Sequence, residues 1–101
     1  MTEQRPLPDE GEVQATVELL AAVAHPARLT VLLALSRRGP LSAGDLQHLA
    51  GLEQSAMSHQ LRVLRKARLI RAERQGRQMI YALDDHHVAH IIEDALTHTR
   101  E

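Results

Sequence analysis

The segment from Ser42 to Leu83 constrains the fold most, because it places two short helical patterns on either side of a tight turn. The first pattern begins at Ser42, a good N-cap residue, and ends at the turn Gly51-Leu52. The second runs from about residue 53 to residue 67. Two short helices joined by a Gly-containing turn are typical of a helix–turn–helix unit. Its buried faces are predicted to carry Leu46, Leu49, Met57, Leu61 and Leu64.

Two strand patterns follow the second helix directly. Residues 69–73 and 78–83 are short runs that contain apolar residues, and Arg74-Gln75-Gly76-Arg77 lies between them. A Gly-bearing turn between such runs predicts a β-hairpin. A helix–turn–helix places its second helix in the major groove of double-stranded DNA. We therefore predict that residues 42–83 form a winged helix–turn–helix that binds double-stranded DNA, with the hairpin as the wing.

Helical patterns flank this module on both sides. Residues 12–24 repeat apolar side chains at helical spacing, and Pro26 suits the first turn of a second helix that ends before Gly39-Pro40. A last helix is expected from about residue 85 to residue 100, with Asp84 or Asp85 as its N-cap. The predicted fold is therefore mainly α with a β-hairpin, in the order α-α-α-α-β-β-α.

The length of 101 residues is sufficient for one domain. Residues 1–11, with two Pro and one Gly, are expected to form a flexible N-terminal tail, and residues 12–101 the domain. The core must be aliphatic, because the chain has no Phe, no Trp and a single Tyr. Small helical units of this kind often complete their core by dimerising. We therefore expect a homodimer, with dimerisation helices at both ends of the domain.

Other features of the composition exclude several classes of protein. The absence of Cys excludes disulfides, thiolate metal sites and thiol redox sensing. No apolar run approaches the roughly 20 residues needed to span a bilayer. The first residues also lack the basic and apolar regions of a signal peptide. We expect a cytoplasmic protein with no membrane partner.

The charges are segregated along the chain, although the formal net charge is only −1. Between His59 and Gln78 the only acidic residue is Glu73, whereas the acidic residues gather near the two ends. A basic centre between acidic ends is typical of a surface that binds DNA. The basic residues of this centre are Arg62, Arg65, Lys66, Arg68, Arg71, Arg74 and Arg77.

The outward face of the second helix is polar and basic. Recognition helices contact base edges with their N-terminal residues, and basic side chains contact phosphates. The alternative is a solvated basic face on an ordinary helical domain, but the combination with a basic-tipped hairpin is uncommon by chance. We predict base contacts from Gln54, Ser55, Ser58 and His59, phosphate contacts from Arg62 and Arg65, and minor-groove or phosphate contacts from Arg74 and Arg77 in the wing.

The last helix carries four of the seven His residues. At about 100° per residue, one stripe holds His87, Asp94, His98 and Glu101, and the opposite, apolar side holds Val88, Ile92, Ala95 and Leu96. His98 and Glu101 are close enough to chelate one ion, and Asp85 and His87 converge if Asp85 caps the helix.

These two pairs are about 16 Å apart along the helix axis, so they cannot meet within one chain. Two such helices packed antiparallel across a two-fold axis would bring Asp85 and His87 of one subunit to His98 and Glu101 of the other. Two equivalent sites per dimer result, each with two imidazoles and two carboxylates, a ligand set that suits Zn(II). The alternative is a solvated helix that is merely rich in His.

At these residues the chain resembles the ArsR/SmtB family of metal-sensing repressors, over nearly all of residues 19–101. The last helix is similar to that of the zinc-responsive subgroup, whose ligands follow the pattern Asp-x-His, ten residues, His-x-x-Glu/His. The other matching stretches are Ala24-His25-Pro26-Ala27-Arg28, residues 55–64, Arg74-Gln75-Gly76-Arg77 and residues 81–87.

The resemblance implies a homodimer paired through its first and last helices, with Asp85, His87, His98 and Glu101 as the metal ligands. It also implies operator contacts from the N-terminal part of the recognition helix. The function implied is that of a repressor: the apo-dimer binds operator DNA, and zinc at the paired last helices lowers the DNA affinity, which derepresses genes for metal efflux or sequestration.

The sequence departs from the family in two ways. It has no cysteine-containing site on the DNA-reading helix, so sensing of arsenic, cadmium or lead through thiolates is excluded. The N-terminal tail has no His and the chain stops at Glu101, which favours zinc over nickel. Cobalt or nickel sensing on the same scaffold, with His90 as a further ligand, is the alternative.

Two other functions compete with metal sensing. One is a DNA-binding regulator with no metal input, whose histidines are structural or solvated. The other is a small metallohydrolase, which needs an open coordination position and a substrate cleft. A site saturated by four protein ligands in so small a chain provides neither, so we expect no enzyme and no small organic substrate.

Overall fold

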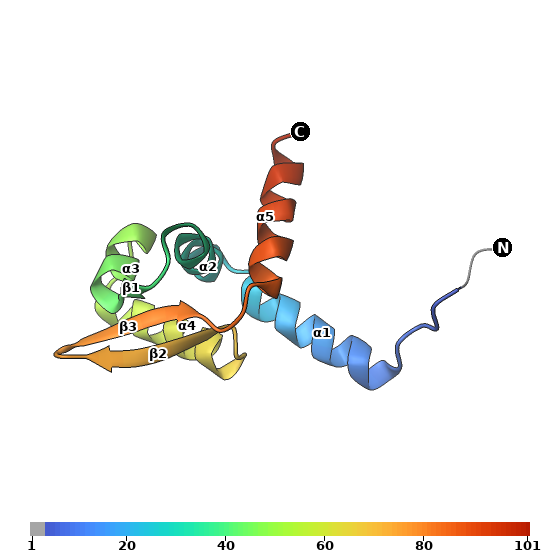
Figure 1. Ribbon diagram of the computed structural model, residues 1–101, viewed down its shortest axis with the longest axis horizontal. Helices are drawn as coiled ribbons and strands as arrows, with labels where there is room; N and C mark the ends of the chain where they lie inside the picture. The colour runs from blue at the N-terminus through green and yellow to red at the C-terminus, as the bar shows by residue number, and fades with distance from the viewer. Residues whose placement is uncertain (1–3) are drawn as a thin grey trace.

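The computed structural model describes residues 4–101 and is mainly helical with a small antiparallel sheet (Figure 1). The predicted fold, a winged helix–turn–helix with a β-hairpin before the last helix, is confirmed. The elements in chain order are α1 (Glu10–Val23), α2 (Pro26–Arg38), β1 (Leu41–Ser42), α3 (Ala43–Ala50), α4 (Gln54–Lys66), β2 (Ile70–Gln75), β3 (Gln78–Leu83) and α5 (His87–Thr99).

Helix α1 begins at Glu10, two residues earlier than predicted. Asp9 forms a capping box with Glu12: the Glu12 N–H donates to Asp9 Oδ1 at 2.8 Å, and the Asp9 N–H donates to Glu12 Oε1 at 3.1 Å. This box satisfies two backbone donors that a helix start leaves unpaired, so it extends the helix. Residues 1–3 of the predicted tail lie outside the described residues.

Strand β1 is an element that the sequence did not predict. Its two residues pair with β3, Leu41 with Tyr81 and Ser42 with Ile80, which gives a three-stranded sheet in the order β1-β3-β2. Two residues are too few to show an alternating pattern, so only the position of β3 reveals this strand.

Helices α1 and α2 meet at a sharp corner of 87°. His25 is the N-cap of α2: its Nδ1 accepts the backbone N–H of Ala27 at 3.1 Å, and Pro26 follows as the first helical residue. Both features satisfy or remove backbone donors that would otherwise be unpaired at the helix start. The corner turns α2 into the core while α1 extends away from it (Figure 1).

The core is aliphatic apart from Tyr81, as the composition requires. It joins α2, α3, α4 and the sheet around Leu32, Leu46 and Leu64, which have no exposed surface. Leu49 was predicted to be buried, but it is 36% exposed. It lies outside the core cluster, in a pocket beside Leu33 and Ala34, because this position of α3 faces the side of α2.

The last helix differs from the prediction at its start and along its apolar side. It begins at His87 with His86 at the N-cap position, so neither Asp84 nor Asp85 occupies that position. Ala89 and Ile92 are its buried residues, whereas Ala95, which was predicted to lie on the apolar side, is exposed. The reason is that α5 packs against α2 near its start and then rises away from the rest of the chain (Figure 1).

No single helix within residues 4–101 is long and apolar enough to cross a membrane.

Candidate functional site

Helix α4 presents a polar face above a fully buried apolar one. Met57, Leu61 and Leu64 on its inner face are 2%, 3% and 0% exposed. The helix is therefore held firmly against the core of its own chain, and its other face is free for a ligand. All the predicted contact residues on this helix are exposed: Gln54, Ser55, Ser58, His59, Arg62 and Arg65.

Helix α3 and the turn that follows it determine how α4 is oriented on the core. Ser42 caps α3, its Oγ accepting the backbone N–H of Asp45 at 3.1 Å. Gly51 ends α3 with φ of 65° in the left-handed region, where a residue without Cβ is favoured. Two well-defined helix ends therefore fix the geometry of the helix–turn–helix, as the sequence predicted.

The wing carries its two predicted arginines beside its tip. Strands β2 and β3 pair in register up to Gln75 and Gln78, so the turn consists of Gly76 and Arg77 alone. Gly76 has φ of 64°, as a two-residue hairpin turn with Gly in its first position requires. Arg74 and Arg77 are both exposed, and the wing projects away from α1 and α5 (Figure 1).

The candidate metal ligands lie in two pairs on α5 and its ends. Asp85 Oδ1 is 3.3 Å from His87 Nδ1 and also accepts the His87 backbone N–H at 2.9 Å. His98 Nδ1 is 4.0 Å from Glu101 Oε2. All four side chains are more than half exposed. Each pair therefore presents one imidazole and one carboxylate to the outside of a single chain.

A single chain does not bring the two pairs together. They lie at opposite ends of α5, about 16 Å apart along its axis. Among residues 4–101 no three His, Asp or Glu side chains are grouped closely enough to hold a metal ion. Imidazole and carboxylate are nevertheless ligands that Zn(II) accepts, so the donor set fits this metal as two half-sites.

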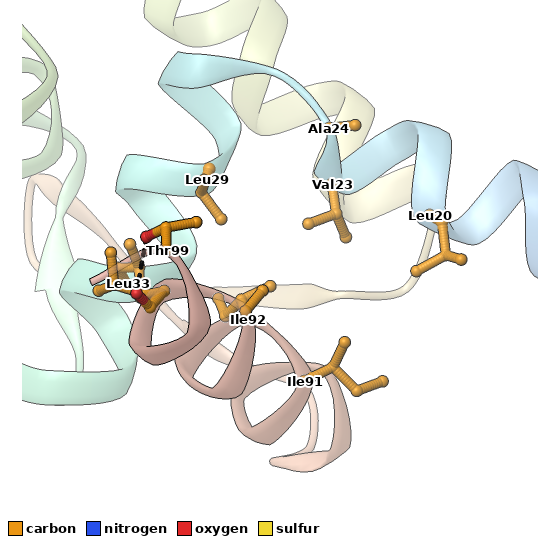
Figure 2. Close-up of a pocket in the computed structure, with 10 residues that line it drawn as sticks. Leu20, Val23, Ala24, Leu29, Leu33, Ile91, Ile92 and Thr99 are labelled. Atoms are coloured by element: carbon orange, nitrogen blue, oxygen red, sulfur yellow. Dashed lines mark hydrogen bonds between the residues drawn. The ribbon is translucent and has the colours of Figure 1, made fainter. Parts of the chain in front are cut away.

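An apolar groove separates α1 from α5. It has a volume of about 450 Å³, and Figure 2 shows Leu20 and Val23 of α1, Leu29 and Leu33 of α2, and Ile91 and Ile92 of α5 around it. Ile91 is 50% exposed on one side of the groove. One stripe of α1 continues this surface, with Val13, Val17 and Leu20 exposed by 48%, 53% and 45%.

Helix α5 is anchored to α2 by an ion pair that the sequence analysis missed. The Arg37 guanidinium donates to both carboxylate oxygens of Glu93, Nε to Oε2 at 2.9 Å and Nη2 to Oε1 at 2.7 Å. This hydrogen bonding lowers the pKa of the Glu93 carboxyl and raises the pKa of Arg37. No local pattern could have revealed the pair, because its members are 56 positions apart in the sequence.

Comparisons with known proteins agree with this geometry. Residues 25–72 match the sequence model of the family described as "Bacterial regulatory protein, arsR family". The chain is 45% identical over 94 residues to the HTH-type transcriptional regulator NmtR of Mycobacterium tuberculosis, and the match covers 93% of this chain and 77% of that protein.

Two solved structures have a similar fold. The AntR antimony-specific transcriptional repressor superposes with a TM-score of 0.86 at 33% identity, over 97% of this chain and 88% of that one. The homodimeric winged helix-turn-helix DNA-binding domain of Mb0332 from Mycobacterium bovis superposes with a TM-score of 0.80. That match covers 97% of this chain and 92% of the other, but at 20% identity it shows the fold alone.

Proposed function

Because this chain belongs to the ArsR/SmtB family of bacterial regulatory proteins, we propose that it is a zinc-responsive transcriptional repressor that works as a homodimer. Membership of this family makes it a DNA-binding transcriptional regulator rather than an enzyme. The observation that supports a response to zinc is that an exposed His lies beside a carboxylate at each end of helix α5.

The proposed dimer closes the apolar surface around α1 and α5. In one chain this surface consists of the Val13–Val17–Leu20 stripe and the groove beside Ile91. Burying it against the same surface of a second copy would remove exposed apolar area from water, the main driving force for association. Such a two-fold interface uses one patch twice, and the Mycobacterium bovis domain shows that this fold occurs as a homodimer.

The same dimer would complete the metal sites. If the two α5 helices pack antiparallel, Asp85 and His87 of one subunit face His98 and Glu101 of the other. Each dimer then holds two equivalent sites, and Zn(II) bound there would link the two subunits as a tetrahedral cross-link. Cobalt or nickel, with His90 as an added ligand, is the alternative on the same helix.

The proposed DNA interface is the exposed face of α4 together with the wing. Gln54, Ser55, Ser58 and His59 would read base edges, since N-terminal residues of a recognition helix lie deepest in the groove. Arg62 and Arg65 of α4 and Arg74 and Arg77 of the wing would neutralise phosphates, so binding should weaken with salt. Successive major grooves require two recognition helices, which the dimer supplies.

Regulation follows if the metal-bound dimer holds its recognition helices at a spacing that no longer matches the operator. The effect is a coupling free energy between the two sites, and it is reciprocal: DNA must weaken metal binding by the same factor. The genes expected under this control encode metal efflux or sequestration.

The test is a zinc titration of the operator-bound dimer followed by fluorescence anisotropy. Stoichiometric zinc should lower the operator affinity by about 5- to 150-fold, the usual range of allosteric coupling. His98→Ala should abolish this response, whereas His90→Ala, on the same exposed helix, should keep it. A regulator without metal input would show no zinc effect in the wild type. Loss of the response in His90→Ala alone would contradict the ligand set.

The choice among metals can be tested by the absorption spectrum of the Co(II)-substituted dimer. Intense visible d–d bands indicate four-coordinate, tetrahedral cobalt and support zinc as the natural metal. Weak bands indicate a higher coordination number, and would favour nickel or cobalt sensing instead.

A further inference from the structure

Arg28, near the start of α2, joins three separate parts of the chain. Its Nε donates to the carbonyl of Ala22 at 2.6 Å and its Nη2 to the carbonyl of Ala21 at 3.4 Å, both in α1. Its Nη1 donates to Oε1 of Gln60, in α4, at 2.7 Å. One partly buried guanidinium therefore links the helix that borders the apolar groove to the helix proposed to read DNA.

The α1 end of this link completes the hydrogen bonding of the helix terminus. The last four carbonyls of a helix have no partner within it. In α1, the Leu20 carbonyl accepts the Ala24 N–H and the Val23 carbonyl accepts the His25 N–H. The remaining two, of Ala21 and Ala22, accept from Arg28. Since α1 has no basic residue in its own last turn, Arg28 also supplies the positive charge that this terminus favours.

The α4 end of the link lies inside the proposed recognition surface. Gln60 follows Ser58 and His59 and precedes Arg62, but it is half-buried because its side chain turns inward to Arg28. The amide accepts a hydrogen bond from a charged donor, which is stronger than a hydrogen bond between neutral groups. This bond attaches the middle of α4 to the end of α1, next to the groove residues Leu20, Val23 and Ala24.

We propose that Arg28 is a positioning residue that sets the orientation of the recognition helix relative to the dimerisation helix, acting through Gln60. Rotation or displacement of α1 at the dimer interface would pull on Gln60 and thereby reorient α4. The inference rests on the proposed function for its regulatory part, because a metal-driven change at the paired helices must reach α4 through contacts such as this one.

The geometry requires an arginine rather than any cation. Three separate nitrogens of one planar fork reach acceptors on two different helices. Lysine carries its charge on a single nitrogen and cannot reproduce such a fork. Arg28→Lys therefore keeps the charge but should break the link, which separates positioning from simple electrostatic attraction to DNA.

The experiment measures operator affinity of the metal-free protein for Arg28→Lys, Gln60→Leu and the double variant. Each single change should weaken operator binding by about 3- to 30-fold, within the range reported for residues that couple distant sites. The double variant should be no weaker than the single ones, because both changes remove the same link. Arg38→Lys, an exposed arginine on the same helix, is the matched control and should bind as the wild type does.

Three outcomes would overturn the proposal. Additive losses would show that Gln60 contacts DNA directly, and full affinity in Arg28→Lys would show that charge alone matters. Third, the loss of operator affinity could disappear at protein concentrations at which sedimentation shows a restored dimer. This result would show that the variants are defective only in dimer association. If the Arg28 variants fold poorly, Gln60→Leu still tests the link, because Gln60 is only half-buried on the surface of α4.

A second measurement separates this inference from the proposed function. If the wild-type dimer responds to zinc, Gln60→Leu should reduce the ratio of metal-free to zinc-bound operator affinity by a similar 3- to 30-fold. An unchanged ratio in Gln60→Leu would overturn the regulatory part of the inference. If the wild type shows no zinc response, the proposed metal function fails, while the metal-free affinities still decide the role of Arg28.

Discussion

Helices α4 and α5 are both 13 residues long and both amphipathic. The apolar face of α4 is buried within its own chain, whereas that of α5 is buried only in part. Helix α4 buries Met57, Leu61 and Leu64 almost entirely. Helix α5 buries only Ala89 and Ile92 and leaves Ile91 half exposed beside an open groove. The apolar face of α4 is therefore buried within one chain, whereas part of the apolar face of α5 remains exposed.

This difference assigns the two helices different physical roles. Because α4 is locked into the core, its outer face is rigid and suits recognition of a fixed DNA shape. Because α5 contacts its own chain mainly through α2, its position in the proposed dimer would depend on the interface between the subunits. A metal bound between two α5 helices in the proposed dimer would therefore shift the subunits without unfolding either of them.

The largest effect is expected from Leu64→Ala in α4. Leu64 has no exposed surface, so its truncation leaves a cavity in the core and should lower the free energy of unfolding by about 2–5 kcal/mol. Urea denaturation would measure this loss. Leu64→Ala should lower the free energy of unfolding much more than Ile91→Ala in α5 does, because Ile91 is already half exposed. Similar losses in the two variants would contradict the difference in burial between α4 and α5.

A smaller effect is expected from Ile91→Glu in α5. The side chain is already 50% exposed, so the fold of one chain should hardly change, but a charge would be buried at the proposed interface. The dimer dissociation constant should rise by about 10- to 100-fold, since each factor of ten corresponds to about 1.4 kcal/mol. Analytical ultracentrifugation would measure it, with Thr97→Glu on the same helix as control. An unchanged dissociation constant would place the interface elsewhere.

The smallest effect concerns the attachment of α5 to α2 through Arg37 and Glu93. Arg37 lowers the pKa of Glu93 in the folded protein, so the ion pair stabilises the fold above the ordinary carboxyl pKa of 4.5. That contribution is lost as the pH falls through the lowered pKa of the folded state. Because Arg37 is exposed and Glu93 is only partly buried, the change should be small.

Melting temperatures from neutral pH down to about pH 3 would show this loss. Glu93→Gln should be slightly less stable than the wild type at neutral pH, and the difference should vanish in acid. Asp94→Asn, at an exposed acid on the same helix, provides the comparison. A difference between wild type and Glu93→Gln that persists at low pH would show that the ion pair is not its source.

Much of the fold could be predicted because its signals are local. The caps at Ser42 and Gly51, the apolar spacing of α4 and the Gly76 turn each involve residues close in sequence. Strand β1 and the exposure of Ala95 were not predicted, because both depend on what lies across from them in space.

The candidate sites show the same division. The polar face of α4 follows from helical spacing alone, and all its predicted contact residues are exposed. The two half-sites of α5 also follow from spacing, since Asp85 with His87 and His98 with Glu101 are near neighbours in the chain. Their assembly into a four-ligand site stays a prediction, because it requires a second subunit.

The sequence by itself determined the order of the five helices and the hairpin, the polar face of the recognition helix and the separation of the two His–carboxylate pairs. Periodicity, capping and turn residues act over a few positions, so a linear reading captures them. Only the tertiary structure decided which apolar faces are completed within one chain and that Arg28 joins α1 to Gln60. Those outcomes depend on how whole elements pack in space, as in the Arg28–Gln60 hydrogen bond, whose partners are 32 positions apart.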